Sequence, residues 1–136
     1  MKTLTLEGDI TAADTLTRLT AQGSVTAPSL VTPAGSSKIT TIVAAIASEA
    51  LANGAQSFFV RIGGNAVKNG EQVIAVSAAG RIAPQAGSDS APQLMEPVIF
   101  ENLDIDIGPS DTVSVAVEGA GTDTGTARAA VTLVFA

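Results

Sequence analysis

Residues 103–118 read LDIDIGPSDTVSVAVE, and this stretch decides the fold class. Apolar residues alternate with acidic ones over 103–107, and valines alternate with small or polar residues over 112–118. A period of two residues is typical of a half-buried strand, and the Gly-Pro-Ser-Asp between the two runs favours a turn. A third β-branched run covers 127–135. The sequence therefore predicts three successive antiparallel strands in this region.

The middle of the chain shows the same alternation. In residues 56–62, QSFFVRI, the side chains of Phe58, Val60 and Ile62 fall on one face of an extended chain, and Arg61 falls on the other. This pattern predicts a strand with one buried and one solvated face.

The segment 63–70, GGNAVKNG, is interpreted as a hairpin loop that leads into a short strand over 72–76. It resembles a phosphate-binding loop only superficially, because the Gly-Lys-Ser/Thr ending is missing. Residues 80–96 are rich in Gly, Pro, Ser and Gln and predict a long loop, a kind of segment that often serves function or an interface. Residues 96–100, EPVIF, lead from this loop into the strand at 103–107, and Pro97 suits an edge or first strand position.

Residues 38–53 fit two structures. Apolar residues at 39, 42, 43, 46 and 50 have the spacing of a helix face, with a serine before them and a glycine after them. The β-branched run over 39–43 and the β-rich neighbourhood argue for a strand, with a loop over 48–55. The strand is favoured.

The first 35 residues are rich in Thr, Ala and Ser. Residues 3–6 and 16–20 are predicted to pair as edge strands, and 24–31 is another strand candidate. We interpret 1–35 as an N-terminal arm or edge strands and 36–136 as a β-sandwich domain. The predicted fold class is all-β, an antiparallel β-sandwich or jelly roll of about eight short strands with an extended N-terminal segment.

The composition excludes most catalytic chemistry. The 136 residues include no His, Cys, Trp or Tyr, although 46% of them are hydrophobic. Catalysis by Ser-His-Asp or Cys-His arrangements lacks its base, and zinc lacks imidazole and thiolate ligands. The net charge is −6, and the seven basic residues form no stripe that could neutralise phosphates. We expect no enzymatic activity, no cofactor and no contact with nucleic acid.

No membrane span or signal peptide is expected. Glu7 and Asp9 stand where a signal peptide needs an apolar run. The longest strictly apolar stretch, 42–47, is far shorter than the roughly 20 residues of a membrane helix.

The composition also suggests assembly. The mean hydropathy is +0.38, which is high for a monomer with 15% charged residues. Apolar surface left over after folding marks a contact with another protein, whereas many small Ala and Val residues would raise the value without forming a patch. Both interpretations stay open here. Arg61, Arg81 and Arg128 stand singly and are candidates for ion pairs between subunits.

Four carboxylates near the C-terminal strands, Asp104, Asp106, Asp111 and Asp123, are candidate calcium ligands, because calcium prefers hard oxygen donors. Asp104 and Asp106 also alternate with apolar residues, which is the pattern of a solvated strand face. Outward charges of this kind protect a sheet from edge-to-edge pairing. The solvated face is favoured, and no metal is expected.

Two segments resemble small virion shell proteins. They are residues 37–70, SKITTIVAAIASEALANGAQSFFVRIGGNAVKNG, and residues 113–135, VSVAVEGAGTDTGTARAAVTLVF. The resemblance is to single jelly-roll capsid proteins, or to the cement proteins that decorate phage and archaeal virus shells. It rests on strand rhythm and contains no diagnostic motif. It implies trimers or other homo-oligomeric rings, contacts with other shell proteins, an N-terminal arm in the subunit contacts, and a place in a virion assembled in the host cytoplasm.

The sequence thus predicts a capsid or capsid-decorating protein that self-assembles through its β-sandwich and N-terminal arm. Trimming residues 1–30 is expected to weaken assembly more than folding. The alternative is a ligand- or calcium-binding adhesion module with a β-sandwich fold, although the lack of Trp and Tyr argues against sugar stacking. A chelator titration that follows thermal stability distinguishes the two.

Overall fold

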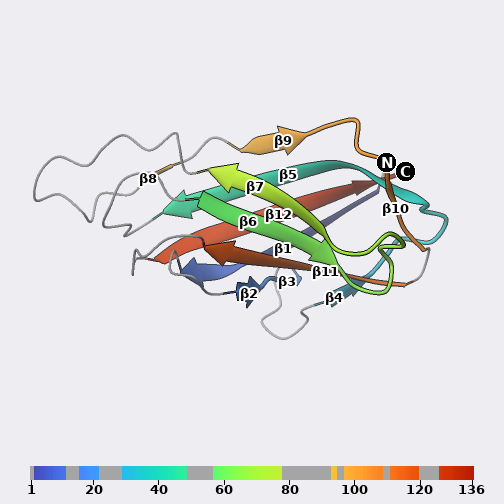
Figure 1. The fold of residues 1–136 in the computed structure, drawn as a ribbon, viewed down its shortest axis with the longest axis horizontal. Helices are drawn as coiled ribbons and strands as arrows, with labels where there is room; N and C mark the ends of the chain where they lie inside the picture. The colour runs from blue at the N-terminus through green and yellow to red at the C-terminus, as the bar shows by residue number, and fades with distance from the viewer. Residues whose placement is uncertain are drawn as a thin grey trace, which may run out of the picture.

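The structure is a computed structural model that describes residues 2–11, 16–21, 29–48, 57–77, 93–94, 97–108, 111–119 and 126–136. Within these ranges, two antiparallel sheets lie one over the other as a β-sandwich (Figure 1). The first sheet contains β1 (Lys2–Thr11), β3 (Thr20–Ala21), β5 (Lys38–Ser48), β8 (Gln93–Leu94), β9 (Val98–Phe100), β10 (Ile105–Asp106) and β12 (Thr126–Phe135). The second contains β2 (Leu16–Arg18), β4 (Ser29–Val31), β6 (Ser57–Gly63), β7 (Gln72–Ser77) and β11 (Thr112–Gly119). The predicted all-β sandwich is confirmed.

The connectivity of the strands is that of a jelly roll. β8, β9 and β10 pair in turn along one edge of β5, and β2 and β4 pair in turn along one edge of β11, so each group occupies one strand position. Eight positions then follow in chain order, with β3 as an added edge strand. The first sheet has the order 6-3-8-1 and the second 2-7-4-5. The paired positions 1 and 8, 2 and 7, 3 and 6, and 4 and 5 are those of a strand pair rolled up on itself.

The core lies between the two sheets and consists of aliphatic side chains with few aromatics. In β6 the alternate residues Phe58, Val60 and Ile62 are buried, as predicted, and Arg61 lies on the other face. Alternate residues of β11 and β12 are buried in the same way: Val113, Val115, Val117, Ala129, Val131, Leu133 and Phe135. Each buried Val, Leu, Ile or Phe side chain contributes roughly 1.5–3 kcal/mol relative to an exposed one.

The ambiguous segment is a strand, β5, which confirms the favoured prediction over 38–48; residues 49–53 lie outside the described residues. Its helix-like spacing has a physical cause. Opposite β5, Phe135 pairs with Ile39 and Val134 pairs with Thr41, so Thr40 is an extra residue, a β-bulge. The bulge puts Ile39 and Ile42, three residues apart, on the same buried face. Side chains three apart on one face are normally a helical sign, and here a bulge produces them.

The three C-terminal strands form as predicted, but the structure places them among other partners. β10 pairs with β5, while β11 pairs with β6, β2 and β4 in the opposite sheet. β12 lies between β1 and β5. Strands that follow one another in the chain therefore alternate between the two layers, because each layer must bury the apolar face of the other.

The N-terminal residues are strands of the sandwich. β1 pairs with β12 from Lys2 opposite Phe135 to Thr11 opposite Thr126, so the two ends of the described chain lie at the same end of the molecule (Figure 1). Residues 16–20 were predicted to form one edge strand, but the structure divides them. β2 joins the second sheet, and β3 pairs with β1 in the first. Leu19, between them, is fully buried. β4 lies within the strand candidate at 24–31, and the boundary suggested at residue 35 stays a prediction.

The segment 63–70 connects the antiparallel strands β6 and β7, as the hairpin interpretation predicted. Its conformation depends on two glycines with positive φ, Gly64 at +96° and Gly70 at +88°. The strand predicted over 72–76 is β7, and β9 lies within the segment 96–100 that leads toward the strand at 103–107. Most of the loops predicted over 48–55 and 80–96 lies outside the described residues.

Candidate functional site

The candidate calcium ligands do not gather in the structure. Asp104 is exposed and forms an ion pair with Lys38, and the hydrogen bond between them raises the pKa of Lys38. Asp106 lies in β10, where its carbonyl oxygen accepts a hydrogen bond from the Lys68 backbone at 3.1 Å. Asp111 is exposed, while Asp123 lies outside the described residues. Within the described ranges, no three carboxylates come together as a metal site would require.

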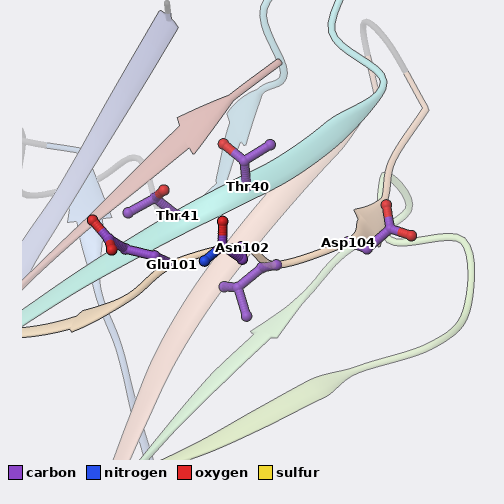
Figure 2. Close-up of a pocket in the computed structure, with 6 residues that line it drawn as sticks. Thr40, Thr41, Glu101, Asn102 and Asp104 are labelled. Atoms are coloured by element: carbon purple, nitrogen blue, oxygen red, sulfur yellow. The ribbon is translucent and has the colours of Figure 1, made fainter.

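A surface hollow lies where the chain runs from β9 to β10 past the bulge of β5 (Figure 2). It is lined by Thr40, Thr41, Glu101, Asn102, Leu103 and Asp104. Asn102 has φ +58°, the left-handed conformation that asparagine tolerates best after glycine, and the next amide, Leu103 N–H, donates to the Thr40 carbonyl at 2.9 Å. Glu101 and Asp104 stand at opposite ends of the hollow in Figure 2. The hollow is polar, and its carboxylates are not paired with each other.

Two of the three isolated arginines form ion pairs within the chain. Arg61 contacts Glu71 at 2.9 Å and Glu118 at 3.0 Å on the outward face of the second sheet. The hydrogen bond to Glu71, followed by that to Glu118, raises the pKa of Arg61. These partners come from β11 and from the turn before β7, so the cluster ties three segments together.

Arg128 is the second. It contacts Asp9 at 3.0 Å and Glu7 at 3.1 Å across the β1–β12 pair, and the hydrogen bond to Asp9 is the main cause that raises the pKa of Arg128. Both Arg61 and Arg128 thus have acids of the same chain beside them, and their pairing between subunits stays a prediction. Arg81 lies outside the described residues.

The outward face of the first sheet has an uncharged centre. Directly opposite residues on neighbouring strands share one face, so the pairing places Thr5, Thr132, Val43 and Ile99 in one row across four strands. We call the central residues of this face the uncharged patch: Val43, Ala45, Ile99, Ala130, Thr132 and Val134. Ile99 is 56% exposed, an unusual value for an isoleucine in a sheet.

Sequence reasoning found the buried faces of these strands but missed the uncharged patch. A signal was present in KITTIVAAIAS and ARAAVTLVF. In both segments the two alternating sets of residues, which point to opposite faces of a strand, are small or apolar apart from Thr and the charges near the segment ends. A strand with one solvated face normally alternates with charged residues, as 103–107 does. Only the strand pairing showed that the outward-facing residues of β5 and those of β12 lie side by side.

Among the described residues, no helix is long and apolar enough to span a membrane. No protein-family model matches the chain, and no curated protein matches it.

Several solved structures have a similar fold. The globular domain of the zebrafish complement 1qA protein is 9% identical, with a TM-score of 0.47 over 97% of this chain and 95% of that chain. The PRD1 vertex protein P5 is 14% identical, with a TM-score of 0.44 over 96% of this chain and 94% of that one. A chain of the acidic stable capsid structure of Helicobacter pylori bacteriophage KHP30 is 8% identical, with a TM-score of 0.41 over 100% of this chain and 89% of that one. At these scores the likeness concerns the fold alone.

Proposed function

We propose that this protein is a structural subunit that self-assembles, and that it serves as a shell or shell-decorating protein of a virus particle. The observation that carries self-assembly is the uncharged patch. The inward face of the same sheet already contacts the second sheet, so the outward patch is not needed for the core of the sandwich. Uncharged surface with a polar surround is typical of a protein contact.

A structural role without enzymatic activity also suits the side chains available. The whole chain lacks His and Cys. The carboxylates that the structure describes near cations, Glu7, Asp9, Glu71, Asp104 and Glu118, are engaged in ion pairs on the surface.

The viral part of the proposal rests on the sequence resemblance of residues 37–70 and 113–135 to virion shell proteins. The jelly-roll connectivity agrees with the fold that this resemblance implies, although the same connectivity occurs in lectins and other proteins. The proposal therefore requires this fold, and an experiment must test whether the chain is part of a virus particle.

Two measurements test the two parts separately. Native mass spectrometry of the purified chain is expected to show a homo-oligomer with a single stoichiometry; monomers at all accessible concentrations would refute self-assembly. Immunogold electron microscopy and protein mass spectrometry of virus particles from the source culture are expected to find the chain on the shell in a fixed ratio to the other shell proteins. If the chain is present only in the particle-free fraction, the viral role is wrong.

A further inference from the structure

We propose that the uncharged patch is the contact through which one copy of this chain binds a second copy, with the outward faces of the two first sheets packed together. This inference rests on the proposed self-assembly and names the surface that performs it. Three properties of this face support the contact: its hydroxyl groups, its charges and its area.

Three hydroxyl groups on or beside the patch already have hydrogen-bond partners within the chain. The hydroxyl groups of Thr5 and Thr132, which are directly opposite each other on β1 and β12, lie 2.9 Å apart and form a hydrogen bond. The Thr40 hydroxyl donates to the Val134 carbonyl at 3.4 Å. Burying an unsatisfied hydroxyl costs about 1–3 kcal/mol, whereas a hydroxyl with a partner loses little when water leaves. The face can therefore become dry without stranding these groups.

The charges on this face lie at its border. At one corner, Arg128 pairs with both Glu7 and Asp9. At the opposite end, Glu101 lines the hollow beside Thr41, and Lys38 pairs with Asp104. Each chain carries a net charge of −6, so two copies repel each other unless they meet where charge is absent or paired. The uncharged patch with its paired corner meets this condition.

The outward face of the second sheet does not meet this condition, because its charged groups lie in its centre. Arg61 and its two carboxylate partners lie in the centre of that face, opposite Ala116 of β11 and Val73 of β7. Burying this ion cluster against a partner would remove the water that solvates three charged groups, and that desolvation opposes association. The two faces of the sandwich therefore differ in their capacity to form a dry contact.

The area is sufficient for a specific contact. The face spans four strands spaced about 4.8 Å apart, and ten residues of strand rise about 3.3 Å each, which gives a flat outline of about 600 Å². Side-chain relief makes the accessible surface larger than the flat outline. A stable protein contact buries about 800 Å² on each partner, so the contact needs the whole outward face, with the paired charges of its border at the rim, where water still reaches them.

A second copy of the chain suits this face because it carries the same uncharged face. Two sheets that pack face to face interdigitate their side chains. The side chains of the uncharged patch carry no charge and can interdigitate with the same side chains of a second copy.

The test compares two lysine substitutions at matched positions by sedimentation velocity of the full chain over a range of concentrations. Ile99→Lys introduces a charge on the patch at a side chain that is 56% exposed, and Val73→Lys does the same on the second sheet at one that is 48% exposed. Ile99→Lys is expected to raise the dissociation constant of self-association about tenfold or more, because it buries an unpaired charge. Val73→Lys is expected to change the constant less than about twofold, and circular dichroism checks that both variants fold.

The outcomes separate this inference from the proposed function. If wild type and Ile99→Lys assemble equally while Val73→Lys dissociates, self-assembly stands and the contact lies on the second sheet. If all three chains assemble equally, the contact lies elsewhere and the patch is refuted. If wild type remains a monomer throughout, both the patch contact and self-assembly are wrong.

A labelling experiment covers the case in which a lysine variant does not fold. Because the chain contains no cysteine, single cysteines report on single positions. Ala45→Cys on the patch is expected to react with a maleimide about tenfold more slowly in the assembled state than at dilutions where the chain is monomeric. Ala116→Cys, on the outward face of the second sheet, is the control and is expected to react at one rate in both states. Equal rates for Ala45→Cys at both concentrations would overturn the assignment.

Discussion

Gly64 and Gly70 permit a sharp test of how the loop after β6 is built. Both have positive φ, at +96° and +88°, so an alanine at either position carries the same kind of backbone strain, about 1–2 kcal/mol. They differ in their surroundings. A Cβ on Gly64 would lie 2.5 Å from the Thr112 carbonyl oxygen and 3.1 Å from the Ser114 nitrogen, whereas a Cβ on Gly70 would meet nothing within 4 Å.

The difference predicts unequal losses of stability. Gly70→Ala is expected to cost about 1–2 kcal/mol, from backbone strain alone. Gly64→Ala is expected to cost about 2–5 kcal/mol, because overpacking against the β11 backbone adds about 1–3 kcal/mol. The same carbonyl of Thr112 accepts the Ala66 N–H at 2.8 Å, so it cannot move away without losing that bond.

Thermal unfolding at one fixed protein concentration measures the effect. The unfolding entropy is about 2.1 cal/mol/K per residue, so for this chain each 1 kcal/mol lowers Tm by about 3.5 °C. Gly70→Ala should lose about 4–7 °C and Gly64→Ala about 7–18 °C. Equal losses, or a larger loss for Gly70→Ala, would show that close approach to β11 is not what requires a glycine at position 64.

Four further predictions follow from the same structure. Phe58→Ala removes the largest fully buried side chain and should cost about 3–5 kcal/mol in chemical denaturation; a loss below about 1 kcal/mol would contradict the core described here. Deleting residues 1–11 removes β1 with buried Leu6 and Ile10 and should abolish cooperative unfolding by circular dichroism, whereas the sequence predicted that trimming residues 1–30 weakens assembly more than folding. The hydrogen bond to Asp104 raises the pKa of Lys38 in the folded state. The ion pair therefore stabilises the fold fully at pH values below the unfolded-state pKa of about 10.4, and this contribution is lost as pH rises through the folded-state pKa. The Tm difference between wild type and Lys38→Gln should therefore narrow above about pH 10.4, and a constant difference would show that the ion pair with Asp104 contributes nothing. Finally, Tm should be the same in calcium and in excess chelator, and a large loss in chelator would favour the calcium-binding adhesion module.

Much of the fold could be predicted from residue alternation. The period of two in 56–62 and 112–118 identified which side chains face the core, because a side chain on a strand can point only to one face or the other. The hairpin at 63–70 was also predictable from its glycines. The spacing of Ile39 and Ile42 was misleading, since the β-bulge at Thr40 that explains it depends on how β12 lies beside β5.

The candidate site was harder to predict. The aspartates near the C-terminal strands are close in sequence, yet Asp104 pairs with Lys38, and Asp111 precedes β11 of the second sheet while Asp106 lies in β10 of the first. The partners of Arg61 and Arg128 come from positions as near as Glu71 and as distant in the chain as Glu7. No local pattern reports such pairs, because they form only when distant strands become neighbours.

By itself, the sequence determined the class of this protein: an antiparallel β-sandwich with an aliphatic core and without the side chains of common catalytic sites. These properties follow from local alternation and composition, which every segment carries independently. The tertiary structure alone decided that β1 belongs to the main sheet, that β11 and β12 lie in opposite layers, and that the second faces of β5 and β12 join into one uncharged patch. The physical reason is that the patch combines residues from several strands. Those strands become neighbours only in the pairing that buries the whole core.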